Sequence, residues 1–289
     1  TAPYAERLAL NPASRDRLMA MEPARYIEVM QRWLDAFLAG PIEPVMGVTE
    51  EELRACGVPA LVVPGNDRTH ASVSGLAAAR QGGAELWTRA RLTGAARSGA
   101  KWDLRLEDGR AVTATVLINA AGAWADPVAS LAGVRPLGIN PYRRTVAQLR
   151  LAAGPPADLP LVLGIDGLFY FKPEAGRLWL SPHDETPTPP CDAAPEELDV
   201  ALAIDRFEHV VDWPITRIEH RWAGLRSFAP DRLPVYGFDP VVAGFFWFAG
   251  QGGFGIQTAP AAADLACALL LGQAGGAVDP QPYDPKRFY

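Results

Sequence analysis

Hydrophobic and polar residues alternate most clearly in one stretch of the first half of the chain. Lys101 to Glu107 alternates between charged and apolar residues, Asp108-Gly109 follows, and a second run, whose first half alternates apolar residues with threonines, extends from Val112 to Ile118. Alternation with a period of two predicts strands, and Asp-Gly between two such runs predicts a tight hairpin turn. The run from Val116 onward has no polar interruption, which is typical of a strand buried on both faces of a layered α/β sheet.

Apolar residues spaced by three and four positions predict helices elsewhere. The first helix is expected from Pro23 to Gly40 and another from Ser72 to Gln81. A third begins at Trp124, and the last is expected from Pro260 to Leu271. Helices that follow strands in this way indicate a layered α/β arrangement.

The pattern changes between Pro141 and Arg221, where short apolar runs are separated by proline-rich segments. Leu161 to Phe171, Leu178 to Ser181 and the stretch around Val210 to Glu219 predict strands of an antiparallel sheet. Pro182 to Pro195 shows no periodicity and is expected to be a loop. The predicted fold class is therefore α/β (α+β).

A glycine-rich segment follows the hydrophobic run Phe245 to Ala249. Gly250 to Gly255 matches G-x-G-x-x-G, but a dinucleotide fingerprint requires a second strand after the helix and an acidic residue about 20 positions on. Only 34 residues follow Gly255, too few for that unit. We therefore expect these glycines to bring backbone N–H groups and a positive helix end towards another electron-rich ligand, such as the edge of a flavin ring.

Two further segments support this interpretation. Val116 to Asp126 and Trp222 to Asp231, together with the glycine-rich segment, resemble the D-amino-acid oxidase-like superfamily of FAD-dependent amine oxidoreductases. Within it, four runs are most similar to bacterial D-arginine dehydrogenase and its D-amino-acid dehydrogenase relatives: Leu131 to Gly138, Pro141 to Arg144, Phe169 to Pro173 and Gly250 to Thr258. The resemblance extends from about Gly82 to Leu271, and its motifs occur in the family's order.

The resemblance implies FAD as the cofactor and two interleaved domains. Residues 1–40, 68–140 and 222–289 correspond to part of a layered FAD-binding domain, and residues 41–67 and 141–221 to an antiparallel-sheet substrate-binding domain. The family's N-terminal βαβ start, with its own glycine fingerprint, has no counterpart here. We therefore expect an N-terminally truncated flavoenzyme, with a natural subunit completed by a partner chain that carries the FAD fingerprint as the alternative.

The resemblance assigns cofactor contacts to two loops. The first contains Ala121 and Gly122, for which an ordinary strand-to-helix turn is the alternative. The second is expected to present backbone N–H groups to the flavin, with Thr258 as the helix N-cap and a possible contact of the ring edge. Its residues are Gly252, Gly253, Phe254, Gly255, Ile256 and Thr258.

Three side chains are implied as substrate ligands. A guanidinium group holds a carboxylate well because its forked donors meet both oxygens, and Arg226 matches the family's carboxylate-binding arginine. Arg144 and Tyr170 match further residues near the substrate carboxylate. Arg143 is expected to point to the opposite face of the strand from Arg144. A surface salt bridge and a core tyrosine are the alternatives.

The implied reaction is oxidative deamination of a D-amino acid. Hydride passes from Cα of a neutral-amine substrate to flavin N5, and water hydrolyses the imino acid to a 2-oxo acid and ammonia. This reaction needs no side chain as an acid or base on carbon, which agrees with the lack of a His/Asp or Cys/His constellation in the sequence, and no catalytic residue is assigned. Glycine, sarcosine or another secondary amine is the alternative substrate, oxidase and dehydrogenase are not separated, and a non-catalytic subunit or relic of the fold is the alternative function.

Composition adds limits on partners. The net charge of -6 and a pI near 5.3 argue against a nucleic-acid surface. No apolar run reaches the roughly 18 residues of a membrane span. We expect a small-molecule amine substrate, an unidentified electron acceptor, no metal, and a cytoplasmic location with peripheral membrane association as the alternative.

Overall fold

The computed structural model describes residues 79–80, 83–156, 159–164, 167–273 and 278–289. These residues form two compact units that interleave in the sequence. Unit 1 comprises residues 143–186 and 193–224, and unit 2 comprises 79–142, 187–192 and 225–289, with the gaps given above. The helix predicted at Pro23 to Gly40 and nearly all of the one at Ser72 to Gln81 lie outside the described residues. The assignment of cofactor and substrate binding to separate domains stays a prediction.

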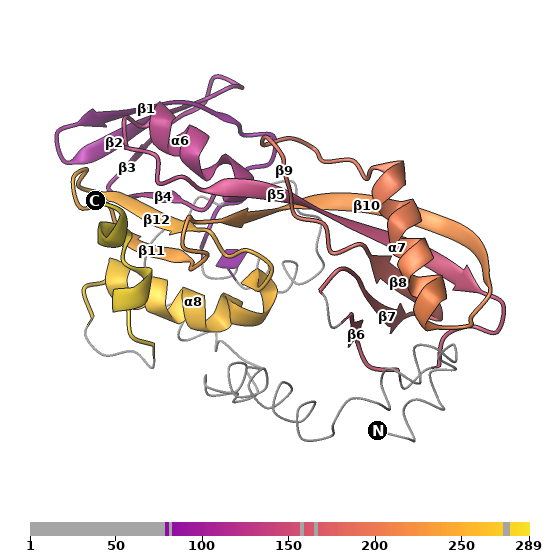
Figure 1. Ribbon diagram of the computed structural model, residues 1–289. Coiled ribbons are helices and arrows are strands. Elements are labelled where there is room, and N and C mark those ends of the chain that lie inside the picture. Colours follow the sequence, from indigo (N-terminus) through magenta and orange to yellow (C-terminus); the bar gives the residue numbers. More distant parts are fainter. Residues whose placement is uncertain (1–78, 81–82, 157–158, 165–166, 274–277) are drawn as a thin grey trace. The chain divides into compact units, whose positions relative to one another are not determined.

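Unit 2 contains two three-stranded sheets and the helices that cover them (Figure 1). The first sheet has the order β1-β2-β3, and the second has the order β11-β12-β4. The strands are β1 (Leu92–Ser98), β2 (Lys101–Leu106), β3 (Ala111–Ala114), β4 (Leu117–Asn119), β11 (Val235–Phe238) and β12 (Phe245–Ala249). The helices are η1 (Gly122–Trp124), α6 (Ala125–Leu131), α8 (Gly255–Leu270), η2 (Gln281–Tyr283) and η3 (Pro285–Phe288). Mixed sheets and helices of this kind confirm the predicted α/β class.

The predicted hairpin is present, but its second strand is divided. β2 pairs antiparallel with β3, and Gly109 adopts a φ of +86° in the turn between them. The expected strand from Val112 to Ile118 ends at Ala114, because the chain then leaves this sheet and joins the second one. There the Leu117 N–H donates to the Gly244 carbonyl at 2.9 Å. The sequence pattern predicts strands in both halves of this run, but it does not indicate which strand each half pairs with.

The prediction that this strand is buried on both faces was wrong. Leu117 is 8% exposed, but its neighbour Ile118 is 38% exposed. Within the described residues β4 is the last strand of its sheet, which accounts for the exposure of one face.

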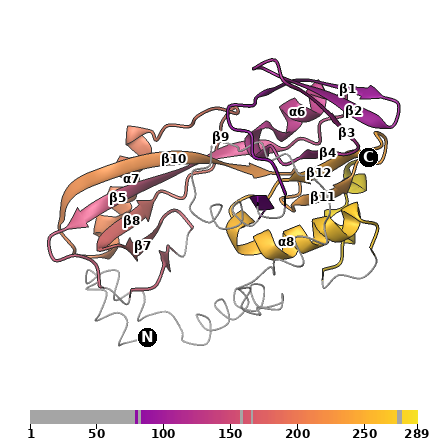
Figure 2. The same cartoon turned by 180° about the vertical axis from the view of Figure 1, so that it is seen from behind.

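Alternate residues of β12 face two different layers of unit 2. Phe245, Trp247 and Ala249 belong to a buried cluster with Trp102 of β2 and Ala129 of α6. The residues between them face the opposite side, where α8 packs along β11 and β12 (Figures 1 and 2). At β12 the sheet β11-β12-β4 is therefore covered on both faces, which is why this strand is a continuous apolar run in the sequence.

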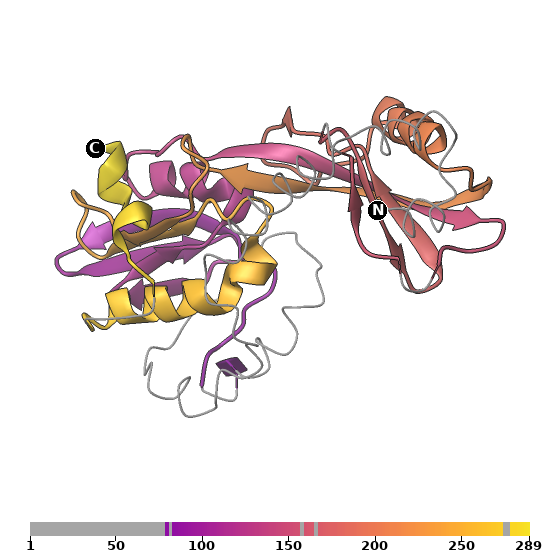
Figure 3. The same cartoon turned by 60° about the horizontal axis from the view of Figure 1, so that its bottom comes forward.

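Unit 1 is an antiparallel sheet with one helix. Its strand order is β10-β5-β8-β7-β6, and β9 pairs with β5. The elements are β5 (Asn140–Leu151), β6 (Val162–Leu163), β7 (Tyr170–Glu174), β8 (Arg177–Ser181), β9 (Thr186–Pro187), α7 (Glu197–Val210) and β10 (Ile215–Phe228). The first residues of β5 and the last of β10 belong to unit 2. α7 packs on one face of this sheet, against Phe171, Leu178 and Leu180 (Figure 3).

Two strand predictions in unit 1 need correction. The run Leu161 to Phe171 forms two separate strands, joined by a turn in which the Gly164 N–H donates to the Phe169 carbonyl at 2.9 Å. The stretch around Val210 to Glu219 is the end of α7 and the start of β10. The missed helix buries Val200, Ala203 and Phe207, whose spacing of three and four was a helical signal.

Among the described residues, no helix combines the length and apolar character that crossing a membrane requires.

A buried carboxylate ties the end of β11 to the rest of unit 2. Asp239 is 5% exposed and accepts hydrogen bonds from the Val242 N–H at 2.8 Å, the Trp247 indole N–H at 3.1 Å and the Tyr289 hydroxyl at 2.6 Å. Burial acts to raise the pKa of this carboxyl, but these donors outweigh it and hold the pKa below its usual value. A lowered pKa means that the folded state favours the ionised form.

We predict that Asp239→Asn lowers the free energy of unfolding by about 2 kcal/mol at pH 7, because an amide cannot accept all of these bonds. The contribution of Asp239 is present above the unfolded-state pKa of about 3.9 and is lost as pH falls through the lower folded-state pKa. Urea unfolding at neutral and acidic pH measures this, and the difference between the two proteins should narrow in acid. Asp264→Asn, at an exposed position of α8, is the control and should change little. A pH-independent difference would contradict the prediction.

Candidate cofactor and substrate site

The candidate cofactor site begins where two parallel strands of unit 2 end. β12 pairs parallel with β4, and the last pair in register is Trp247 with Asn119. Carboxyl ends of parallel strands meet at one edge of the sheet, and ligands of layered α/β folds bind beyond that edge. The segments that leave this edge are 120–122 and 250–254, the two loops predicted to approach the flavin. The structure therefore brings these two loops to one edge of the sheet.

The first loop is a tight turn with open space above it. Gly122 has a φ of +56°, a conformation that favours glycine, and no heavy atom lies within 4 Å of the position a Cβ would take. Asn119 is 1% exposed and fixes the turn from below. Its side-chain amide donates to the Ala125 carbonyl at 2.8 Å and accepts from the Ala121 N–H at 3.3 Å. The backbone of the turn is thus ordered and accessible, as close approach of a cofactor requires.

The second loop is held from one side by the end of β10. Gly252 has a φ of +56°, and a Cβ there would lie 2.4 Å from the Phe228 ring. The Gly252 N–H donates to the Ser227 carbonyl at 2.9 Å. Gly253 and Phe254 are exposed, so the other side of the loop is accessible. Only glycine fits at position 252, which explains part of the glycine-rich sequence by packing.

The helix after this loop begins earlier than predicted. α8 starts at Gly255 with Phe254 as its N-cap residue, and Pro260 lies inside the helix. Thr258 is therefore not an N-cap: it lies within the first turn, and its hydroxyl donates to the Phe254 carbonyl at 3.0 Å. The N-cap was sought beside Pro260 because proline favours the first turn of a helix. The positive end of α8 consequently lies within Gly253 to Ile256 itself.

Arg226 lies directly against this loop. A Cβ on Gly253 would come within 2.8 Å of the Arg226 Nη1, so the guanidinium group occupies the space above that glycine. Among the residues that the structure describes, Arg226 has no acidic partner and no hydrogen-bond acceptor. It is half-buried, and an arginine held in this way beside the loop is available to an anionic ligand.

In unit 1, Arg144 and Tyr170 lie on the same face of the sheet. Tyr170 is opposite Ser181 across β7 and β8, and Ala147 is opposite Leu180 across β8 and β5, which puts the even-numbered residues of β5 on the Tyr170 face. Arg143 is on the opposite face and forms ion pairs with Glu196, Asp199 and Asp184.

Arg143 and Arg144 of β5 both already have acceptors in unit 1. Arg144 is 8% exposed, donates to the Asp184 carbonyl at 2.8 Å and pairs with Glu185 at 3.1 Å. Tyr170 is half-buried, and its ring meets the edge of His183 with a centroid distance of 5.5 Å. The Nδ1 of His183 bonds to the Gly167 carbonyl, which orients the ring. The assignment of Arg144 and Tyr170 to the substrate stays a prediction.

Two residues of these regions were missed in the sequence. Asn119 carried a signal, since an asparagine that ends an apolar run commonly bonds the backbone of the following turn. His183 carried none, because its neighbour Tyr170 is brought to it by the pairing of β7 with β8.

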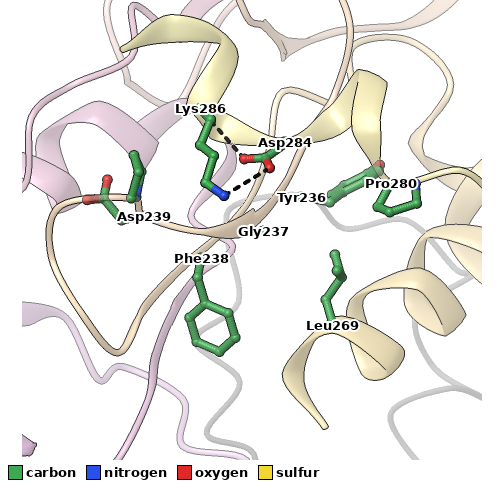
Figure 4. Close-up of a pocket in the computed structure, with 9 residues that line it drawn as sticks. Tyr236, Gly237, Phe238, Asp239, Leu269, Pro280, Asp284 and Lys286 are labelled. Carbon is green, nitrogen blue, oxygen red and sulfur yellow. Dashed lines mark hydrogen bonds and ion pairs between the residues drawn. The ribbon is translucent and has the colours of Figure 1, made fainter. Parts of the chain in front are cut away.

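A separate concave surface of about 300 Å³ lies on unit 2 (Figure 4). Its lining includes Tyr236, Phe238, Leu269 and the ion pair of Lys286 with Asp284 at 3.9 Å. None of the residues predicted for the cofactor or the substrate lines it.

The chain is similar in sequence to known flavoproteins. A protein named FAD-dependent oxidoreductase domain-containing protein 1, from Mus musculus, is 28% identical over 202 residues, which cover 62% of this chain and 40% of that protein. Glycine oxidase from Pseudomonas aeruginosa is 30% identical over 176 residues, or 58% of this chain and 45% of that protein. The chain thus spans less than half the length of these relatives.

Glycine oxidase from Geobacillus kaustophilus has a similar fold. Its crystal structure superposes with a TM-score of 0.62 at 24% identity, covering 73% of this chain and 56% of the other. The family described as FAD dependent oxidoreductase matches residues 4–269. The chain therefore belongs to this family of FAD-dependent oxidoreductases, and FAD, the cofactor of the family, fits the two accessible loops at the edge of β4 and β12.

Proposed function

We propose that this chain forms the flavin-facing and carboxylate-binding part of an enzyme that oxidises an amino acid or a related amine. The observation that carries the proposal is the position of Arg226. Its guanidinium group lies against Gly253, in the second loop (residues 250–254), which is called the glycine loop below. The group has no acidic partner among the described residues. A half-buried arginine without a partner suits a substrate carboxylate, which would be held next to the loop that faces the flavin.

The proposed reaction is oxidative deamination of a D-amino acid, with glycine, sarcosine or another secondary amine as the alternative. The similarity to glycine oxidases supports a small substrate. Glycine has no side chain, so its oxidation is compatible both with the D-amino-acid proposal and with the alternative. Tyr170 and Arg144 are proposed as further substrate ligands from the family resemblance alone. Arg144 would have to share its guanidinium group with Glu185 in that role.

Each part of the proposed site has a definite physical task. Arg226 binds both oxygens of the carboxylate and so limits the orientation of the Cα–H bond, a large part of the rate enhancement that positioning provides. The N-terminus of α8 directs N–H groups and positive potential to the loop, where they stabilise negative charge that develops on a ligand. Bound FAD supplies the acceptor for the hydride that leaves Cα. Water then converts the imino product to a 2-oxo acid and ammonia.

The alternative class is a non-catalytic subunit or a relic of the fold. Both classes keep the strands and the core, so stability does not separate them. They differ in whether a bound flavin is reduced when an amine is added.

We predict that anaerobic addition of glycine or D-alanine to the FAD-loaded protein bleaches the visible absorbance of the flavin. L-Alanine should act much more slowly, because a fixed carboxylate clamp presents Cα–H of only one enantiomer to the ring. Stopped-flow absorbance measures the rates. Loaded protein that no amine reduces would favour the non-catalytic alternative, and reduction by L-alanine at an equal rate would contradict the D preference.

We predict that Arg226→Met lowers kcat/KM by about 10- to 100-fold, because a hydrogen-bonded ion pair contributes about 1.5–3 kcal/mol. FAD should still bind. Arg217→Met is the matched control, since Arg217 is an exposed arginine on the same strand, and it should leave the kinetics unchanged. Unchanged saturation of the Arg226 variant by substrate would exclude the proposed clamp.

We predict that Gly253→Ala raises KM with little loss of stability. The added methyl group would lie 2.8 Å from the Arg226 Nη1, so the flexible side chain must move away from its present position. Gly224→Ala is the control, because it lies two residues before Arg226 and its methyl group would meet no heavy atom within 4 Å. Steady-state kinetics and thermal unfolding of both variants separate the two effects. Equal KM values in the two variants would show that this arginine position is not used.

A further inference from the structure

Two polar side chains, Asn119 and Asp126, link the 120–122 turn to the glycine loop. Asn119 bonds to the backbone at both ends of the segment from Ala121 to Ala125. Asp126 follows directly in the sequence and is half-buried. Its carboxylate accepts hydrogen bonds from the N–H groups of three consecutive residues, Leu137 at 3.2 Å, Gly138 at 2.8 Å and Ile139 at 2.9 Å.

The segment held by Asp126 packs against the second loop. A Cβ on Gly250 would lie 3.6 Å from the Ile139 Cδ1, so the Ile139 side chain lies beside the first glycine of the loop. A Cβ on Gly138 would lie 3.2 Å from the Pro230 Cγ, two residues beyond the end of β10. The contacts therefore run from the first loop through Asp126 to residues 137–139, and from there to Gly250 and to the end of β10.

We propose that Asn119 and Asp126 are positioning residues of the FAD site, which hold the 120–122 turn and the glycine loop at a fixed separation. The proposal rests on the cofactor site proposed above and adds two residues that touch no cofactor atom themselves. β4 and β12 fix only the starting points of the two loops, and neither turn belongs to a strand. Side-chain bonds to their backbone, together with packing on residues 137–139, fix the path beyond the strands.

The bonding pattern makes each residue hard to replace. Asn119 is 1% exposed, so its removal leaves the Ala121 N–H and the Ala125 carbonyl without this hydrogen-bond partner. Unsatisfied polar groups cost free energy, and the turn would lower that cost by changing its conformation. Gly138 and Ile139 both donate to the same oxygen of Asp126. An asparagine at position 126 would place an amide donor near N–H donors or lose one of the oxygens. Either change lets the loops move relative to each other.

The test compares Asn119→Ala and Asp126→Asn with Asp239→Asn in this 289-residue chain. Asp239 is a matched control because it is also a buried carboxylate of unit 2 with backbone N–H donors, but it follows β11 at the end of the sheet remote from the glycine loop. FAD dissociation constants are measured by flavin fluorescence at a temperature where all variants remain folded. Amide hydrogen exchange of the cofactor-free chain is measured in parallel.

We expect both positioning variants to bind FAD at least 10-fold more weakly, and the control to bind within about threefold of the wild type. Exchange should accelerate at Gly250 to Phe254 in the Asp126 variant, although this residue touches none of them. Equal FAD affinity of all variants, or equal losses in all three, would overturn this inference and leave the cofactor site standing. Unchanged exchange at Gly250 to Phe254 in the Asp126 variant, or the same acceleration in the Asp239 control, would overturn the inference whatever the FAD affinity of the wild-type chain.

Discussion

The parallel pairing of β4 with β12 is the constraint on which the candidate site depends. The two strands are separated by more than 120 positions in the sequence, and they pair in register from Phe245 with Leu117 to Trp247 with Asn119. Antiparallel pairing would send the two following loops to opposite edges. Because the pairing is parallel, the turn with Gly122 and the glycine loop leave the same edge, where backbone N–H groups can meet one ligand.

Arg226 differs from the arginines that stabilise the fold through several acceptors. Arg143 lies among three carboxylates of unit 1, and Arg287 pairs with Asp231 and bonds to three backbone carbonyls. Such arginines stabilise the fold and have little capacity left for a ligand. Arg226 has none of these acceptors among the described residues, and its guanidinium group lies against Gly253. Because its donors are not used by an acceptor among the described residues, Arg226, and not Arg143 or Arg287, is the arginine proposed to bind the substrate carboxylate.

Glycine has two different tasks in the cofactor region. At Gly122 the surroundings are open, and glycine is needed for the positive φ alone. At Gly252 both the φ and the Phe228 ring require it, and at Gly253 an added methyl group would meet the Arg226 guanidinium. The glycine-rich sequence therefore combines turn geometry, packing against β10 and space for the Arg226 side chain. A motif with these requirements need not bind a dinucleotide phosphate, although its spacing matches that fingerprint.

The sequence by itself determined the elements whose signal is local. Alternation located β2, Asp108-Gly109 located the hairpin turn, and the apolar run before Gly250 located β12. The motifs in their order also identified the family and the residues of both loops. These features depend on neighbours within a few positions, so periodicity and turn chemistry are sufficient to find them.

Tertiary structure decided what depends on partners distant in the sequence. The run from Val112 to Ile118 divides because its second half pairs with β12, and Ile118 is exposed because β4 ends its sheet. The start of α8 at Gly255, with Pro260 inside, follows from packing of the whole helix on β11 and β12, which overrides the local preference of proline for a first turn. The position of Arg226 against Gly253 and the bonds of Asp126 to residues 137–139 arise from pairing and packing that no local pattern specifies. Local sequence sets which conformations each segment can adopt, but only the assembled sheets and helices determine which side chains meet.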